Sequence, residues 1–183
     1  MNMIRASRPK EEIKLLGDDN APLSTEETID ALFARHFPGS VKTAPITTLP
    51  STEISKDQLT SFMPFVTRAK VKRAFRQFGP LKAPGLDEIR PILIQKLPNT
   101  AWDFLTILYK ASIKLGVTPE SWRCSSVIFI PKTGKPRYDN ASAFRPITLS
   151  TFLLKGLERI LLWFTARTHF VHKPMVANQF AFM

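Results

Sequence analysis

A basic segment in the second half of the chain carries the residue types best suited to bind a polyanion. Its cations are Lys132, Lys135, Arg137 and Arg145. The β-rich runs 125–131 and 144–149 predict two short antiparallel strands joined by an exposed polar loop. Antiparallel pairing would bring Lys132 and Arg145 close together at one exposed end. A lysine beside an arginine that bonds in a bidentate manner suits a triphosphate or a nucleic-acid backbone. A hairpin loop that is basic only for solubility is the alternative.

A second group of cations lies on a helix predicted over residues 67–78. Arg68, Lys72 and Arg76 recur at intervals of four residues, away from the apolar side of the helix. Such a row is compatible with two interpretations, a solvated basic face and a surface that contacts phosphates. The turn-rich stretch that follows adds Lys82.

The overall charge favours a polyanionic partner. The 183 residues include 26 Lys plus Arg and 15 Asp plus Glu, for a formal charge of +11. Residues 1–50 hold 6 basic and 7 acidic side chains, so the excess lies beyond them. Nucleic acid is the commonest polyanion that a basic domain meets in a cell. A single cysteine, no apolar run of membrane-spanning length and no N-terminal signal predict an intracellular protein of the cytoplasm or nucleus.

The acidic side chains predict no catalytic or metal site. Beyond residue 90 each acid is isolated, at Asp103, Glu120, Asp139 and Glu158. Two-metal phosphoryl or nucleotidyl transfer requires acids that converge on paired cations. The three histidines, at 36, 169 and 172, lack the companions of a zinc site, which needs three or four ligands.

Local patterns predict the elements that position the basic residues. Ser24 to Glu27 has the spacing of a capping box, and Pro38-Gly39 ends the helix that follows. Residues 40–60 have no clean period and predict a surface connection. We therefore expect a helical and loop lead-in region, 1–60, and a main domain, 61–183.

Further helices are expected in the main domain. A short one carries Ile89, Leu93 and Leu97 on one face, with Pro91 in its first turn. The next is capped by Asn99 or Thr100 and ends at Gly116. Its predicted apolar stripe is Ala101, Leu105, Leu108, Ser112 and Leu115. A last helix runs from a cap at Ser150 or Thr151 to about Thr168. Both faces of the first strand are apolar, which predicts a covered strand. The expected fold class is α+β, mostly helical with a short antiparallel β-hairpin.

Four sequence blocks resemble reverse transcriptases of non-LTR (LINE-type) retrotransposons. Residues 82–89, KAPGLDEI, resemble the family's K-x-P-G-x-D-x-I segment. Residues 119–135 and 144–160 resemble the first and second fingers strands with the helix that follows. Asn178 to Phe182 resembles the segment that leads into the palm. The blocks keep the family's order and spacing over about residues 65–183, which makes the match specific.

The resemblance implies an RNA-directed DNA polymerase with a right-hand fold, of which this chain covers the fingers. It implies that Lys132 (or Lys135) and Arg145 hold the triphosphate of the incoming deoxynucleotide. It implies a structural role for Pro84-Gly85 and Asp87, and proximity to template RNA or primer DNA for a further set of cations. These are Arg68, Lys72, Arg76, Lys82 and Arg137. Mg²⁺ would serve the intact enzyme, and we expect none to be bound by this chain.

The chain also departs from the family. The family's catalytic aspartates lie in the palm and would follow Met183, so we expect a fragment truncated before the palm and inactive alone. The alternatives are a non-catalytic RNA- or DNA-binding remnant and an unselected pseudogene fragment. The sequence sets neither the template preference nor the oligomeric state.

Overall fold

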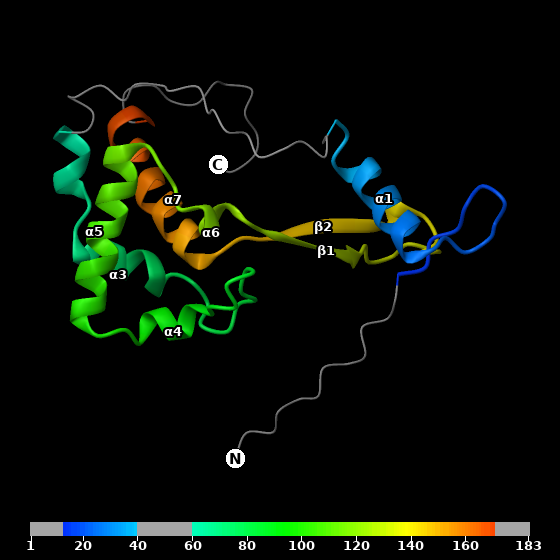
Figure 1. The fold of residues 1–183 in the computed structure, drawn as a ribbon, viewed down its shortest axis with the longest axis horizontal. Coiled ribbons are helices and arrows are strands. Elements are labelled where there is room, and N and C mark those ends of the chain that lie inside the picture. The colour runs from blue at the N-terminus through cyan, green and yellow to red at the C-terminus, as the bar shows by residue number, and fades with distance from the viewer. Residues whose placement is uncertain (1–12, 40–59, 171–183) are drawn as a thin grey trace, which may run out of the picture. The chain divides into compact units, whose positions relative to one another are not determined.

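A computed structural model describes residues 13–39 and 60–170 (Figure 1). The chain divides into two compact units, one made of residues 1–49 and 127–147 and the other of residues 50–126 and 148–183. The predicted connection 40–60 lies almost wholly outside the described residues, and the Asn178 to Phe182 block lies entirely outside them. The predicted boundary near residue 60 therefore stays a prediction.

The first unit packs one helix, α1 (Thr25–His36), against part of a β-hairpin. The hairpin consists of β1 (Ser126–Pro131) and β2 (Phe144–Leu149), with a 3₁₀ turn, η2 (Ala141–Ala143), before β2. The predicted capping box of α1 is confirmed: Ser24 Oγ accepts from the Glu27 N–H, and the Glu27 carboxylate accepts from the Ser24 N–H. The core of this unit joins side chains far apart in sequence, Leu15 and Leu32 with Ala143 and Phe144.

The second unit is helical. Its elements are η1 (Met63–Phe65), α3 (Arg68–Arg76), α4 (Pro91–Gln95), α5 (Asn99–Leu115), α6 (Glu120–Arg123), α7 (Phe152–Thr165) and a π-helical turn, η3 (Ala166–Phe170). α7 crosses α3 closely because Gly156 has no side chain: a Cβ there would lie 2.6 Å from Tyr109 Oη and 2.7 Å from the Phe75 ring. Tyr109 Oη donates to Leu153 O over 2.6 Å. Burial raises the pKa of Tyr109 far above its usual range, so this hydroxyl keeps its proton.

The α+β class with an antiparallel hairpin is confirmed, and so are three local features. Pro91 lies in the first turn of α4, Gly116 ends α5 in the left-handed conformation (φ 63°), and Thr151 caps α7 through its hydroxyl. Each feature depends only on neighbouring residues, which is why sequence alone can predict it. Among the described residues no helix combines the length and apolar character needed to cross a membrane.

The apolar face predicted for α4 is wrong, and the stripe predicted for α5 is right only at Leu105 and Ser112. In α4 the buried residues are Pro91 and Ile94, whereas Leu93 is 61% exposed. In α5 the buried face is Trp102, Leu105, Thr106, Tyr109, Ser112 and Ile113, and Leu115 is 71% exposed. The large rings of Trp102 and Tyr109 rotate the inward face of α5 because they pack on Phe75 and Trp122.

The predicted cap of α5 is also wrong. α5 begins at Asn99, and Pro98 holds the cap position without a side-chain hydrogen bond. The Asn99 side chain instead accepts a hydrogen bond from Lys72 Nζ over 2.8 Å. The Asn99 side chain therefore bonds to Lys72 of the neighbouring helix α3 and does not cap its own helix.

Candidate nucleotide- and nucleic-acid-binding surface

The register of the hairpin decides which side chains share a face. The Lys132 N–H donates to Ala143 O over 2.8 Å, and in an antiparallel pair such a bond joins residues directly opposite each other. Continuing this register places Arg145 opposite Ile130. Opposite residues share a face, and diagonal neighbours on it are about 7–8 Å apart. Arg145 therefore shares a face with Ile130, and Lys132, one residue beyond the end of β1, lies diagonal to Arg145.

We give the name cationic face to Arg145, Ile128, Ile130 and Ile147 of the strands together with Lys132, which follows the end of β1. The three isoleucines are 41%, 45% and 39% exposed. The expectation of a strand covered on both sides is therefore wrong for the part of the chain that the structure describes. The other face is the covered one, where Phe129 and Phe144 join the core beneath α1. Sequence reasoning missed the isoleucines, although their spacing of two from Arg145 and Lys132 marks the shared face.

Lys132 is held in place, whereas Arg145 is not. The half-buried Lys132 donates from Nζ to Ser142 O over 2.7 Å. Tyr138 Oη donates to Lys132 O over 2.8 Å, so the backbone is fixed as well. Arg145 is exposed, and its guanidinium has no hydrogen bond or ion pair within the described ranges.

The other two cations of the loop differ from each other. Arg137 Nε pairs with Asp139 Oδ2 at 2.6 Å, so a carboxylate already neutralises this predicted contact. Lys135 follows Gly134, which turns the chain with φ 80°. Lys135 is exposed and lacks a polar partner among residues 13–39 and 60–170.

The structure divides the predicted basic row of α3. Arg68 Nη1 contacts both carboxylate oxygens of Asp103, at 3.0 and 3.2 Å. Lys72 donates to Asn99, so both side chains tie α3 to α5. Arg76 is exposed and has no polar partner in the described chain, and the same holds for Lys82 in the following turn. Of these four predicted contacts, Arg76 and Lys82 are the cations left for an external phosphate.

Other cations of this unit pack against aromatic rings. Lys70 Nζ lies 3.2 Å from the centre of the Phe65 ring, and desolvation lowers its pKa. The Arg159 guanidinium lies 3.9 Å from the centre of the Phe78 ring and donates to Ala74 O over 2.9 Å. Desolvation lowers the pKa of Arg159 as well. Such stacked cations stabilise helix packing and are poorly placed to bind ligand.

The segment around Asp87 is held against the start of α7. A Cβ on the buried Gly85 would lie 2.9 Å from backbone atoms of Ser150 and Thr151, so only glycine allows this approach. Asp87 Oδ1 accepts from the Ile89 N–H over 3.2 Å, while its buried Oδ2 has no partner among the described residues. Glu88 adopts φ 55°, which is strained for a residue with a side chain.

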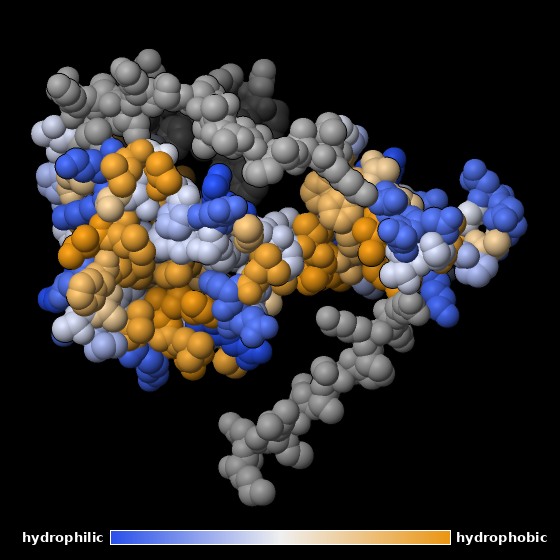
Figure 2. Space-filling model, in the orientation of Figure 1, coloured by the Kyte–Doolittle hydropathy of each residue, from blue (hydrophilic) through white to orange (hydrophobic). Residues whose placement is uncertain are grey.

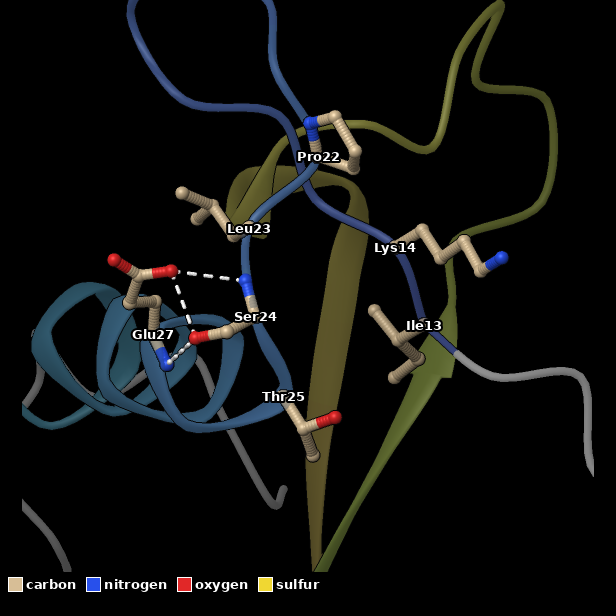
Figure 3. Close-up of a pocket in the computed structure, with 7 residues that line it drawn as sticks. All are labelled: Ile13, Lys14, Pro22, Leu23, Ser24, Thr25 and Glu27. Carbon is tan, nitrogen blue, oxygen red and sulfur yellow. Dashed lines mark hydrogen bonds between the residues drawn. The ribbon is translucent and has the colours of Figure 1, made fainter.

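The described residues contain no metal centre. No group of three or more His, Cys, Asp or Glu in residues 13–39 and 60–170 could hold a metal ion. A hollow with a volume of about 380 Å³ lies at the start of α1 (Figure 3). It is lined by Ile13, Lys14, Pro22, Leu23, Ser24, Thr25 and Glu27. Ser24 and Glu27 bond to each other there, so the capping box already uses their polar atoms.

The surface also contains hydrophobic area away from the hairpin. Figure 2 shows a hydrophobic region over α4, the helix that exposes Leu93. α5 exposes further apolar side chains, with Phe104 and Ile107 among them. These residues bring no charge or hydrogen-bonding group and add nothing to phosphate binding.

Comparison with known proteins identifies relatives over much of the chain, although no family model matches it. The chain is 33% identical over 117 residues to the RNA-directed DNA polymerase from mobile element jockey of Drosophila melanogaster. It is 29% identical over 137 residues to the probable RNA-directed DNA polymerase from transposon X-element, and 28% identical over 92 residues to that from transposon BS, both of the same species.

The matches cover 64%, 71% and 50% of this chain but 13%, 15% and 10% of the respective relatives. The chain therefore spans a small part of the length of these proteins. The resemblance predicted from the sequence blocks is confirmed: the homologues of this chain are RNA-directed DNA polymerases from Drosophila mobile elements.

Proposed function

We propose that this chain is the fingers part of an RNA-directed DNA polymerase of a non-LTR mobile element, and that its cationic face binds the incoming deoxynucleoside triphosphate. The proposal rests on the antiparallel register of the hairpin, in which the exposed Arg145 lies diagonal to Lys132 at the end of β1. Arg145 offers a whole guanidinium fork to a phosphate. Lys132 retains two N–H donors beyond the one directed at Ser142 O.

The isoleucines complete the proposed binding surface. Ile128, Ile130 and Ile147 form an exposed apolar strip beside the two cations. A nucleotide has the same two-part chemistry, with an apolar base face next to a polyanionic phosphate chain. Burying the base on the strip while the phosphates meet the cations would satisfy both parts at once.

Template RNA or primer DNA is proposed to contact Arg76 and Lys82, the two exposed members of the predicted set without a partner in the described chain. Arg68, Lys72 and Arg137 are engaged with Asp103, Asn99 and Asp139, so we expect them to contribute less. Mg²⁺ would serve the complete enzyme. The described residues do not fit a metal ion, and no step is derived through it.

Binding of a fluorescent deoxynucleoside triphosphate, followed by anisotropy, tests the proposal. Arg145→Ala should weaken binding by about ten- to hundredfold, because hydrogen bonds to charged groups contribute about 1.5–3 kcal/mol. Arg123→Ala is the matched control, since Arg123 is exposed on α6 and is unpaired among the described residues. Equal losses in the two variants would show that only overall charge matters and would refute the assignment.

A non-catalytic RNA- or DNA-binding role is the second candidate, favoured by the net charge of +11. It predicts binding of single-stranded RNA with a steep, linear fall of log affinity against log salt concentration. It also predicts no preference for a nucleoside triphosphate over a monophosphate beyond that expected from charge. A clear preference for the triphosphate that disappears in Arg145→Ala would exclude this role as the whole function.

A further inference from the structure

The position of the Lys132 amine depends on the turn η2. Lys132 follows β1, and its Nζ donates to the carbonyl of Ser142 within η2. The Lys132 N–H donates to the next carbonyl, that of Ala143. Any displacement of η2 would therefore move both the amine and the backbone of Lys132.

Two groups from the N-terminal part of the chain hold this turn. His36 Nε2 lies 3.0 Å from Ala141 O, although the two residues are 105 positions apart. The Leu16 N–H donates to Asp139 O over 3.0 Å. A carbonyl only accepts hydrogen bonds, so His36 Nε2 must carry the proton in this contact.

Every backbone carbonyl from Asp139 to Ala143 accepts a hydrogen bond. The five successive carbonyls accept, in order, from the N–H of Leu16, the N–H of Ala143, His36 Nε2, Lys132 Nζ and the N–H of Lys132. The Ala141 carbonyl also accepts from the N–H of Phe144, so His36 is its second donor and the one from outside the hairpin. The contacts of His36 and Lys132 fall on adjacent carbonyls, 141 and 142. These two carbonyls belong to adjacent peptide planes that meet at the Ser142 Cα, so a rotation of the first plane also changes the position of the second.

Packing holds His36 in reach of the turn. The half-buried His36 ring lies 5.7 Å from the Phe129 ring, and Phe33, one turn earlier on α1, lies 6.0 Å from it edge-on. Leu32 of α1 joins Ala143 and Phe144 in the core of this unit. The end of α1 is therefore fixed on the covered side of the hairpin, opposite the cationic face.

We propose that His36 is a positioning residue for Lys132: by donating to Ala141 O it orients η2 so that Ser142 O holds the lysine amine on the cationic face. The role of Lys132 in phosphate binding rests on the proposed function, whereas its positioning by His36 does not. The lead-in region thereby becomes part of the support of the proposed nucleotide site.

Two substitutions of His36 separate hydrogen bonding from packing. His36→Phe keeps a ring beside Phe129 and removes the donor, whereas His36→Gln keeps an amide donor at similar reach. The direct readout is the acylation rate of the Lys132 amine under limiting reagent, measured by peptide mass spectrometry. Lys135, which has no polar partner in the described chain, is the internal reference.

His36→Phe should raise the acylation rate of Lys132 relative to Lys135 by about three- to tenfold, the range expected for the loss of one hydrogen bond. His36→Gln should restore a rate near that of the unchanged protein. An unchanged ratio in His36→Phe would overturn the proposal, and so would a failure of His36→Gln to restore it.

Triphosphate binding separates this inference from the proposed function. If both hold, His36→Phe weakens triphosphate binding several-fold and His36→Gln does not. If Lys132→Ala leaves triphosphate binding unchanged, phosphate binding by Lys132 is wrong. The acylation ratio would still decide whether His36 positions the amine.

Discussion

Replacing Gly156 with alanine should destabilise the helical unit by about 3 kcal/mol. The added Cβ would lie 2.6 Å from Tyr109 Oη and 2.7 Å from two atoms of the Phe75 ring, both in fully buried side chains. Overpacking of this kind costs about 1–3 kcal/mol. If Tyr109 moves aside, its hydrogen bond to Leu153 O is lost, at about 1–3 kcal/mol for a buried group. The higher helix propensity of alanine offsets about 1 kcal/mol.

Urea unfolding followed by tryptophan fluorescence measures this change, because Trp102 and Trp122 are both buried in the affected core. With an m-value of about 1–3 kcal/mol per molar urea, the midpoint should fall by about 1–3 M. Tyr109→Phe removes the nearest atom, so the double variant should lose less stability than the two single losses combined. A midpoint equal to or above that of the unchanged protein would refute the close approach of α7 to α3 and α5.

Three further outcomes are expected. Arg76→Ala should lower the salt slope of single-stranded RNA binding by about 0.7, one phosphate contact, while Arg68→Ala leaves it unchanged because Asp103 already pairs with Arg68; anisotropy titrations at several salt concentrations measure the slopes, and equal slopes would contradict the assignment. Glu88→Gly should stabilise the chain by about 0.5–1 kcal/mol in urea, because glycine adopts φ 55° without strain, and Glu88→Ala should give no such gain. Hydrogen bonds from Ser24 hold the pKa of Glu27 below its ordinary value of 4.5, so its ionised form stabilises the fold above pH 4.5 and this contribution is lost as the pH falls through the lowered pKa. The difference in urea midpoint between the unchanged protein and Glu27→Gln should therefore shrink from pH 6 to pH 3, and growth of the difference would be inconsistent with this linkage.

Several elements could be predicted from the sequence because their causes are local. The Ser24 capping box, the stop at Gly116 and the cap at Thr151 each involve residues within a few positions of one another. The apolar faces of α4 and α5 could not be predicted in the same way. Leu93 and Leu115 are exposed although they have helical spacing, and the rings of Trp102 and Tyr109 occupy inward positions instead.

In the proposed site, too, some features follow from local sequence patterns and others from tertiary contacts. Strand period and antiparallel pairing, both visible in the sequence, suffice to propose that Lys132 and Arg145 lie near each other. Whether a cation is free to bind a phosphate depends on the tertiary structure, because the groups that bond to the cation come from other segments of the chain. Asp103 reaches Arg68 across 35 residues, and Ser142 O reaches Lys132 through the folded turn.

The sequence by itself determined the α+β composition, several helix ends and the identity of the basic segments, since charge and short-range spacing are properties of the chain. The tertiary structure alone decided which cations remain unpaired in the described chain, which face of the hairpin is open, and that His36 lies against the turn that holds Lys132. Those outcomes depend on contacts between segments distant in sequence, which a local pattern cannot encode.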